Sequence, residues 1–386
     1  MKYPKLVDFI DFISAYSHVS LHDAISDSIV AFSHSSTSMS DSAPQTISAG
    51  STPAGDAESK PESPPRTTAI DKRTSRNWRT YLTYNFMKPF AERLVTPSEV
   101  QPAGSPELTP PSGVSSSCIV EHRVVADINV YDITSRHPST AEVKQKRIFY
   151  FCGGGWSGLP TPDHWKMCAH FVQELNRKHG VAVVSLVSYP LAPNTPAPVA
   201  LPMLQKWYHE VFSIHANEDI IFAGDSSGGN IALALPLHVL HTNLATPCPI
   251  GILAISPSVD LRHEHPDLEA LSKKDPLLSL DRINVTATGW CGEWSRGDPR
   301  VSPTLAELSV LRERNVIVSG VLGEMDVLSP EAEVFVDKLA ENRVRGRWLV
   351  WERQMHCFPL MFSYKVVPEA VEAVKWIVDE LIGFTP

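Results

Sequence analysis

The 386-residue sequence lacks several features that would assign it to a membrane, secreted or nucleic-acid-binding class. It has no run of about 18 apolar residues that could span a bilayer. No Lys/Arg run stands out and the formal net charge is −9, so a nucleic-acid partner is not expected. A signal peptide is not recognisable either, because Asp8 and Asp11 interrupt the first apolar stretch and no small-residue cleavage site follows. These absences favour a cytoplasmic, globular protein.

The cysteines offer neither a disulfide framework nor a metal site. There are six, without a CxxC pair or the spacing of metal ligands, and they lie in segments that read as buried. We therefore expect reduced thiols that pack as small hydrophobic side chains. His263 and His265 flank a glutamate, but no third ligand is evident nearby. The sequence implies no metal and no organic cofactor.

The first 118 residues divide into three segments of different composition. Residues 1–32 carry apolar side chains at helical spacing, which predicts an amphipathic helical segment and leaves a lid role or a peripheral membrane contact open. Residues 33–68 are rich in Ser, Thr, Pro and Ala, so we expect a disordered linker. Residues 69–118 are expected to be a lead-in or N-terminal cap, with a helix over 73–94 and a proline-rich loop after it.

From residue 119 to 386, strand-like and helical patterns alternate. Strands are expected at 119–131, 147–152, 181–187, 219–223, 249–255, 315–321 and 347–351, and helices at 164–178, 198–214, 227–242, 331–342 and 368–383. Apolar strands separated by helices predict an α/β domain with a mostly parallel central sheet and helices on both faces. Residues 262–298 interrupt the alternation and predict a helical cap insertion.

A Gly-x-Ser-x-Gly sequence at 224–228 lies where a strand is expected to turn into a helix. This is the setting of a nucleophile elbow, in which small flanking residues allow a strained, sharp turn at the serine. Ser226 is the predicted nucleophile, because the rival Ser227 lacks the two flanking glycines. The backbone N–H of Ser227 would point from the helix N-terminus toward a developing oxyanion.

Three glycines, 153–155, follow Cys152 at the end of the strand expected over 147–152. Taken alone they could be a simple glycine-rich turn. Such a run also lets backbone N–H groups approach a ligand closely, as the second half of an oxyanion hole requires. The elbow farther along the chain favours the second interpretation.

The two motifs, CGGGW and GDSSGG, resemble the HGGG and GDSAGG motifs of the hormone-sensitive-lipase family of α/β-hydrolases. Further stretches match in the same order: YPLAP (189–193), SPSVDL (256–261), DPRVSP (298–303), GEMDVL (323–328) and MHCF (355–358). The resemblance covers 119–386 and implies the α/β-hydrolase fold, with Gly153 and Gly154 as oxyanion donors beside Ser227. The sequence departs from the family at Cys152, where the family has histidine. A nucleophilic Cys152 is not expected, because no neighbouring feature would activate its thiolate.

In this fold a nucleophilic serine is followed along the chain by an acid and then by a histidine, each after a strand. Asp326 follows the strand expected over 315–321, and His356 follows the strand expected over 347–351. Glu324 is the competing acid. The family resemblance places the carboxylate two residues before Leu328, which selects Asp326. The histidine would act as the base, and the carboxylate would fix its tautomer.

The resemblance implies a serine carboxylic-ester hydrolase that works through an acyl-enzyme on a small to medium, hydrophobic ester. The stretches around SPSVDL and GEMDVLSPEAE look like those of fungal members, which include steryl-acetate deacetylases and biosynthetic esterases or transacylases. A transacylase, amidase or thioesterase would use the same residues, so these alternatives stay open. A non-catalytic ligand-binding protein is the alternative from another class, as in the plant gibberellin receptors of this family. Those receptors lack the triad histidine, whereas His356 is present here.

Overall fold

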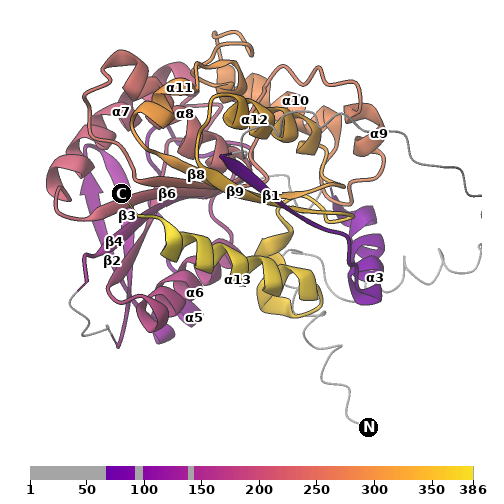
Figure 1. Cartoon of the computed structure of the whole chain (residues 1–386), viewed down its shortest axis with the longest axis horizontal. Coiled ribbons are helices and arrows are strands. Elements are labelled where there is room, and N and C mark those ends of the chain that lie inside the picture. Colours follow the sequence, from indigo (N-terminus) through magenta and orange to yellow (C-terminus); the bar gives the residue numbers. More distant parts are fainter. Residues whose placement is uncertain (1–66, 92–98, 138–142, 386) are drawn as a thin grey trace, which may run out of the picture. The chain divides into compact units, whose positions relative to one another are not determined.

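The computed structural model describes residues 67–91, 99–137 and 143–385 (Figure 1). The helical segment predicted over 1–32 and nearly all of the linker predicted over 33–68 lie outside these residues. In the part of the chain that the structure describes, no helix is both long and apolar enough to cross a bilayer.

A nine-stranded sheet forms the centre of the fold, with the strand order β1-β9-β8-β7-β6-β4-β5-β3-β2. The strands are β1 (Thr68–Arg73), β2 (Cys118–Val125), β3 (Ile128–Ser135), β4 (Lys146–Phe151), β5 (Ala182–Ser188), β6 (Asp219–Asp225), β7 (Gly251–Ile255), β8 (Ile317–Gly323) and β9 (Gly346–Trp351). Neighbours from β1 to β5 in this order pair in parallel, whereas β3 pairs antiparallel with both β5 and β2. The predicted mostly parallel α/β-hydrolase sheet is confirmed.

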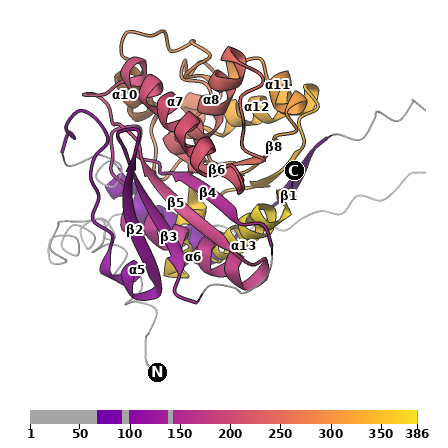
Figure 2. The ribbon, with the colours of Figure 1, turned by 90° about the vertical axis from the view of Figure 1, so that its left-hand side faces the viewer.

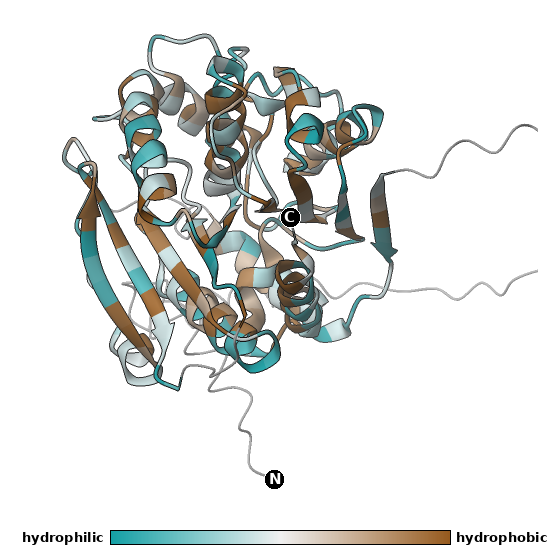
Figure 3. Ribbon diagram, turned by 60° about the vertical axis from the view of Figure 1, so that its left-hand side comes forward, coloured by the Kyte–Doolittle hydropathy of each residue, from teal (hydrophilic) through white to brown (hydrophobic). Residues whose placement is uncertain are grey.

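Helices cover both faces of this sheet, as Figures 1 and 2 show. The main helices are α3 (Trp78–Met87), α5 (Ser112–Ser117), α6 (Pro162–Lys178), α7 (Ala197–Ile214), α8 (Ser226–Thr242), α9 (Leu268–Ser272), α10 (Leu280–Cys291), α11 (Ser309–Glu313), α12 (Ser329–Glu341) and α13 (Pro368–Gly383). Helices α6 and α13 lie on one face, and α7, α8 and α12 lie on the other. Because both faces are covered, every residue of β4, β5, β6 and β7 is buried. Apolar residues accordingly run along the central strands in Figure 3.

Three elements differ from the sequence-based expectation. Residues 119–131, expected as one strand, belong to the hairpin of β2 and β3, whose turn places Ala126 and Asp127 at φ of 48° and 66°. Thr68, assigned to the linker, instead begins β1, a half-exposed edge strand that pairs with β9. The β2–β3 turn lacks the glycine that commonly marks a hairpin turn in a sequence. The pairing of β1 joins it to a distant segment, which local composition does not reveal. The helix expected over 73–94 begins later, at Trp78, because the Asn77 side chain caps it by accepting the N–H of Arg79.

Candidate active site

The predicted site residues come from four strands that end at the same edge of the sheet. Strand β6 leads into Ser226, β8 into Asp326, β9 into His356 and β4 into the glycine loop at 153–155. These strands are mutually parallel, so their carboxyl ends share one edge. Ligand sites of open α/β sheets form at this edge.

The structure brings Ser226, His356 and Asp326 into hydrogen-bond contact. The His356 Nε2 atom lies 2.9 Å from the Ser226 Oγ atom, and the His356 Nδ1 atom lies 2.8 Å from Asp326 Oδ2. Asp326 and His356 are almost completely buried. Burial alone would lower the pKa of His356, but the Asp326 carboxylate outweighs it and holds that pKa well above its ordinary value. This is the geometry of a serine, a base and a group that orients the base.

The two alternatives considered from the sequence, Ser227 as nucleophile and Glu324 as acid, do not contact the His356 ring through any hydrogen bond found among the described residues. The Ser227 Oγ atom lies 3.5 Å from the Tyr189 hydroxyl, whereas the His356 ring contacts Ser226. Glu324 is partly exposed and forms an ion pair with Lys72 at 3.8 Å. The geometry therefore favours Ser226 and Asp326 over these alternatives.

The turn at Ser226 is strained and tightly packed. Ser226 has φ of 53°, in the left-handed region that non-glycine residues rarely adopt. A Cβ atom on Gly228 would lie 2.0 Å from the Phe151 carbonyl oxygen, and one on Gly224 would lie 2.6 Å from that oxygen. The two glycines therefore let β4 and its following loop lie directly against the elbow.

The structure corrects one expectation about the oxyanion hole. The N–H of Gly153 donates to the Asp225 Oδ1 atom at 3.0 Å, so this group is already occupied. Among the described residues, no acceptor is found for the N–H of Gly154 or of Ser227. The Ser227 N–H lies in the first turn of α8, where no preceding helical carbonyl is available. The oxyanion role stays a prediction for Gly154 and Ser227, whereas the Gly153 N–H ties the loop to the elbow.

Asp225 is the centre of a buried polar cluster behind the elbow. Its carboxylate accepts the Tyr150 hydroxyl at 2.9 Å as well as the Gly153 N–H, and it lies 3.2 Å from His164 Nε2. Burial would raise the pKa of Asp225, but the charge of His164 outweighs it and holds that pKa below its ordinary value. The His164 Nδ1 atom lies 3.0 Å from the backbone nitrogen of Thr161 at the start of α6. The cluster therefore joins β4, α6, the glycine loop and the nucleophile turn.

His164 and Tyr150 were not identified from the sequence. His164 is one of 15 histidines, and its only local signal is its place three residues after Thr161 in a helix-capping box. Tyr150 stands in a buried strand where a hydroxyl has no visible purpose before its partner is known. Both contact Asp225, which is near them only in the folded protein, where β4, β6 and α6 pack together.

The surroundings of Cys152 do not favour a nucleophilic role. Its side chain is buried, and burial raises the pKa of its thiol well above the ordinary value. Its backbone carbonyl accepts the Tyr189 hydroxyl at 2.8 Å. The glycine loop is thus held through its backbone, by Tyr189 at residue 152 and by Asp225 at residue 153.

We expect Asp225→Asn to weaken this loop and to destabilise the fold by about 3 kcal/mol, because it leaves the buried His164 without its counter-charge. The asparagine amide would also be unable to accept all the hydrogen bonds that the carboxylate accepts. Thermal unfolding and ester turnover measure the two effects. Asp219→Asn, at the opposite end of β6, is the matched control, since Asp219 pairs with the half-exposed Lys144. Equal losses in both variants would contradict the role given to Asp225.

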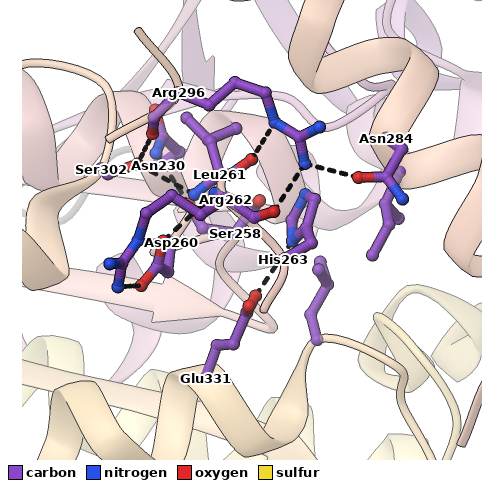
Figure 4. Close-up of polar contacts among 12 residues, drawn as sticks. Asn230, Ser258, Asp260, Leu261, Arg262, His263, Asn284, Arg296, Ser302 and Glu331 are labelled. Atoms are coloured by element: carbon purple, nitrogen blue, oxygen red, sulfur yellow. Dashed lines mark hydrogen bonds and ion pairs between the residues drawn. The ribbon is translucent and has the colours of Figure 1, made fainter. Parts of the chain in front are cut away.

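The segment 262–298, predicted as a cap, is anchored at its base by a second polar cluster (Figure 4). The Arg296 guanidinium donates to the carbonyl oxygens of Leu261 and Arg262 and to the Asn284 side chain. His263 Nδ1 lies 3.0 Å from the Glu331 carboxylate on α12, and both side chains are buried. The start of this segment is therefore attached to the helix that follows Asp326.

Comparisons with known proteins agree with this architecture. A family model described as the alpha/beta hydrolase fold matches residues 148–360, which include Ser226, Asp326 and His356. An esterase of Acinetobacter venetianus is 29% identical over 195 residues, covering 50% of this chain and 62% of that esterase. Esterase LipU of Mycobacterium tuberculosis is 27% identical over 244 residues, covering 61% of this chain and 77% of LipU. Human hormone-sensitive lipase is 29% identical over 160 residues, covering 40% of this chain and 14% of the lipase.

The chain thus spans less than two thirds of the Acinetobacter esterase and a small part of the human lipase. Among solved structures, an esterase from the bacterial hormone-sensitive lipase family superposes with a TM-score of 0.64 at 18% identity, covering 80% of this chain and 99% of that one. A hormone-sensitive lipase from a metagenome library gives 0.61 at 21% identity, with 78% and 92% covered. Such identities show a shared fold.

Proposed function

The chain belongs to the α/β-hydrolase family and resembles its hormone-sensitive lipases, and from this premise we propose that it is a serine carboxylic-ester hydrolase. The observation that carries the proposal is the continuous contact from Ser226 Oγ through the His356 ring to Asp326, at 2.9 and 2.8 Å. The esterases among its relatives support the same class of bond.

In the first half of the proposed reaction, His356 Nε2 takes the proton of Ser226 as Oγ attacks the ester carbonyl. Asp326 accepts the other ring N–H and stabilises the imidazolium that forms. The N–H groups of Gly154 and Ser227 would hold the negative charge that develops on the carbonyl oxygen. The tetrahedral intermediate then collapses, and the alcohol leaves with the proton from His356. An acyl group remains on Ser226.

In the second half, His356 takes a proton from water as the water oxygen attacks the acyl carbonyl. Collapse of this second intermediate releases the carboxylic acid and returns the proton to Ser226. The steps use no metal and no organic cofactor. If an alcohol, rather than water, entered at this stage, the same residues would transfer the acyl group.

We propose a small to medium, hydrophobic ester as the substrate. Residues 324–328, which carry Asp326, form a loop between β8 and α12 that we call the acid loop. Apolar side chains of the 262–298 segment pack beside it, where Leu268 and Ile283 contact Val327 and Leu328. Helix α10 also lies over the glycine loop, because a Cβ atom on Gly155 would meet the Thr286 side chain at 2.7 Å. The segment thus brings apolar side chains to the acid loop and α10 to the glycine loop, and a mainly apolar surrounding suits a substrate without charge near the ester.

Hydrolysis of p-nitrophenyl acetate, butyrate and octanoate tests the proposal. We expect turnover of at least one ester and labelling of Ser226 by a fluorophosphonate, located by peptide mapping. The preferred chain length would report the depth of the acyl pocket. A protein with neither turnover nor labelling would contradict the hydrolase proposal and favour ligand binding. Acyl transfer to an added alcohol in preference to water would instead identify a transacylase.

A further inference from the structure

A second buried carboxylate lies beside the acid loop, on the segment between α9 and α10. Asp275 is only 3% exposed. Its Oδ1 atom accepts the N–H groups of Leu277 and Leu278 at 2.8 and 3.2 Å, and its Oδ2 atom accepts the N–H of Val327 at 2.9 Å. One carboxylate thus joins its own segment to the residue directly after Asp326.

The Val327 contact bears directly on how Asp326 is held. The N–H that Asp275 accepts belongs to the peptide bond formed by the Asp326 carbonyl group. On the other side of that residue, the Leu328 N–H donates to Asp326 Oδ1 at 2.9 Å, and Asp326 Oδ2 faces His356. The Asp275 carboxylate therefore fixes the turn from which the Asp326 side chain reaches the histidine.

The 262–298 segment is also held against the acid loop by apolar packing and by a polar contact near its first residue. Leu268 and Ile283 form a buried cluster with Val327 and Leu328, and Leu278 and Leu280 pack against it. The His263–Glu331 pair in Figure 4 holds the start of the segment to α12, which begins three residues after Asp326. Movement of the 262–298 segment would consequently displace the acid loop.

Asp275 also acts on its surroundings through charge. Among the described residues, Asp326, His356 and the Tyr84 phenol are titratable groups that interact with it. The His356 ring also faces the Cys357 thiol, whose Sγ atom lies 3.4 Å from Nε2. Burial, together with the negative charge of Asp326, raises the pKa of Asp275 to about 7, while His356 and the N–H donors favour its ionised form. An ionised Asp275 adds negative charge near His356 and increases the proton affinity of that ring.

We propose that Asp275 is a positioning residue for the ester hydrolysis, through which the seating of the 262–298 segment sets the orientation of Asp326 and the basicity of His356. The inference rests on the proposed function. Asp275 acts through Asp326 and Val327 and takes no proton from the serine. It links the part of the protein that bounds the substrate to the group that orients the base.

The test is Asp275→Asn in the full-length protein, with kcat and kcat/KM for p-nitrophenyl butyrate measured from pH 5 to 9. An asparagine side chain cannot accept at both of its ends, so one of the two links is lost, and it carries no charge. We expect kcat to fall about 10-fold or more, as an orienting contact that is lost typically costs. The acid limb of kcat/KM should move to lower pH by about 0.5 to 1 unit, because the loss of a nearby negative charge lowers the proton affinity of the base.

Asp281→Asn is the matched control, since it makes the same chemical change in the same segment at an exposed position. It should leave the rate and the pH profile unchanged. Asp275→Glu keeps the charge but displaces it, so kcat should fall while the acid limb stays close to that of the wild type. This second variant also serves if Asp275→Asn unfolds, which circular dichroism would show.

The outcomes separate this inference from the proposed function. Turnover by the wild type with an acid limb that does not move in a folded Asp275→Asn variant would overturn the inference and leave the hydrolase intact. If Asp275→Asn unfolds, the Asp275→Glu variant decides. An unchanged kcat, or an acid limb displaced from that of the wild type, would then overturn the inference. A wild type without turnover would overturn the hydrolase, and the inference with it.

Discussion

Ser226→Ala is expected to lower kcat for p-nitrophenyl butyrate by about 10⁴- to 10⁶-fold, because it removes the atom proposed to form the acyl-enzyme. KM should change little, since the side chain lost is small and His356 and Asp326 remain in place. Turnover is measured at saturating substrate, and fluorophosphonate labelling is measured in parallel. Labelling should disappear together with turnover.

Ser227→Ala is the comparison that gives this result its meaning. It removes the rival hydroxyl but keeps the backbone N–H, and it converts GDSSGG into the GDSAGG of the family that the sequence resembles. We expect its kcat to stay within about 10-fold of the wild type, since only a long contact with Tyr189 at 3.5 Å is lost. Loss of labelling in Ser227→Ala with retention in Ser226→Ala would assign the nucleophile to Ser227 instead.

Gly228→Ala should have the largest effect on stability, with a loss of about 4 kcal/mol or more. The added Cβ atom would lie 2.0 Å from the Phe151 carbonyl oxygen and 2.7 Å from that of Cys152. Both contacts are with backbone, so neither a rotamer change nor a flexible side chain can relieve them. Relief would require β4 and the glycine loop to move away from the elbow. Chemical denaturation measures the loss of stability, and turnover should fall with it.

Gly289→Ala is the control for that substitution. Gly289 lies inside α10, and a Cβ atom placed on it would meet nothing within 4 Å. Because alanine is a better helix former than glycine, this variant should gain about 0.5 to 1 kcal/mol of stability. A Gly228→Ala protein as stable as the wild type would contradict the close packing of β4 on the elbow.

Much of the hydrolase domain could be predicted from local patterns. The expected strand over 147–152 is β4 at 146–151, and the expected helix over 368–383 is α13 with the same limits. These elements are long and apolar, or amphipathic, because each is buried on both faces or on one. The edge strand β1 has no such pattern. Its pairing with β9 is decided by tertiary contact.

The candidate site divides in the same way. Ser226 and the glycines at 153–155 are recognisable because a sharp turn and close backbone approach require particular residue types at fixed spacing. Asp326 and His356 are recognisable from chain order, since each follows a parallel strand and all such strands end at one edge. The part of the site that chain order and turn chemistry dictate is therefore readable from the sequence.

Only the tertiary structure decided which polar groups of the site already have hydrogen-bond partners within the protein. Gly153 was expected to bind an oxyanion, but Asp225 occupies its N–H at 3.0 Å. His164 and Asp275 become meaningful only when α6 and the 262–298 segment bring them to Asp225 and Val327, respectively. Hydrogen bonds and charge effects between buried groups act over a few ångströms, whereas these partners lie 61 and 52 residues apart in the chain. The sequence by itself determined the fold class and the candidate triad, and the packing of distant segments determined how that triad is held.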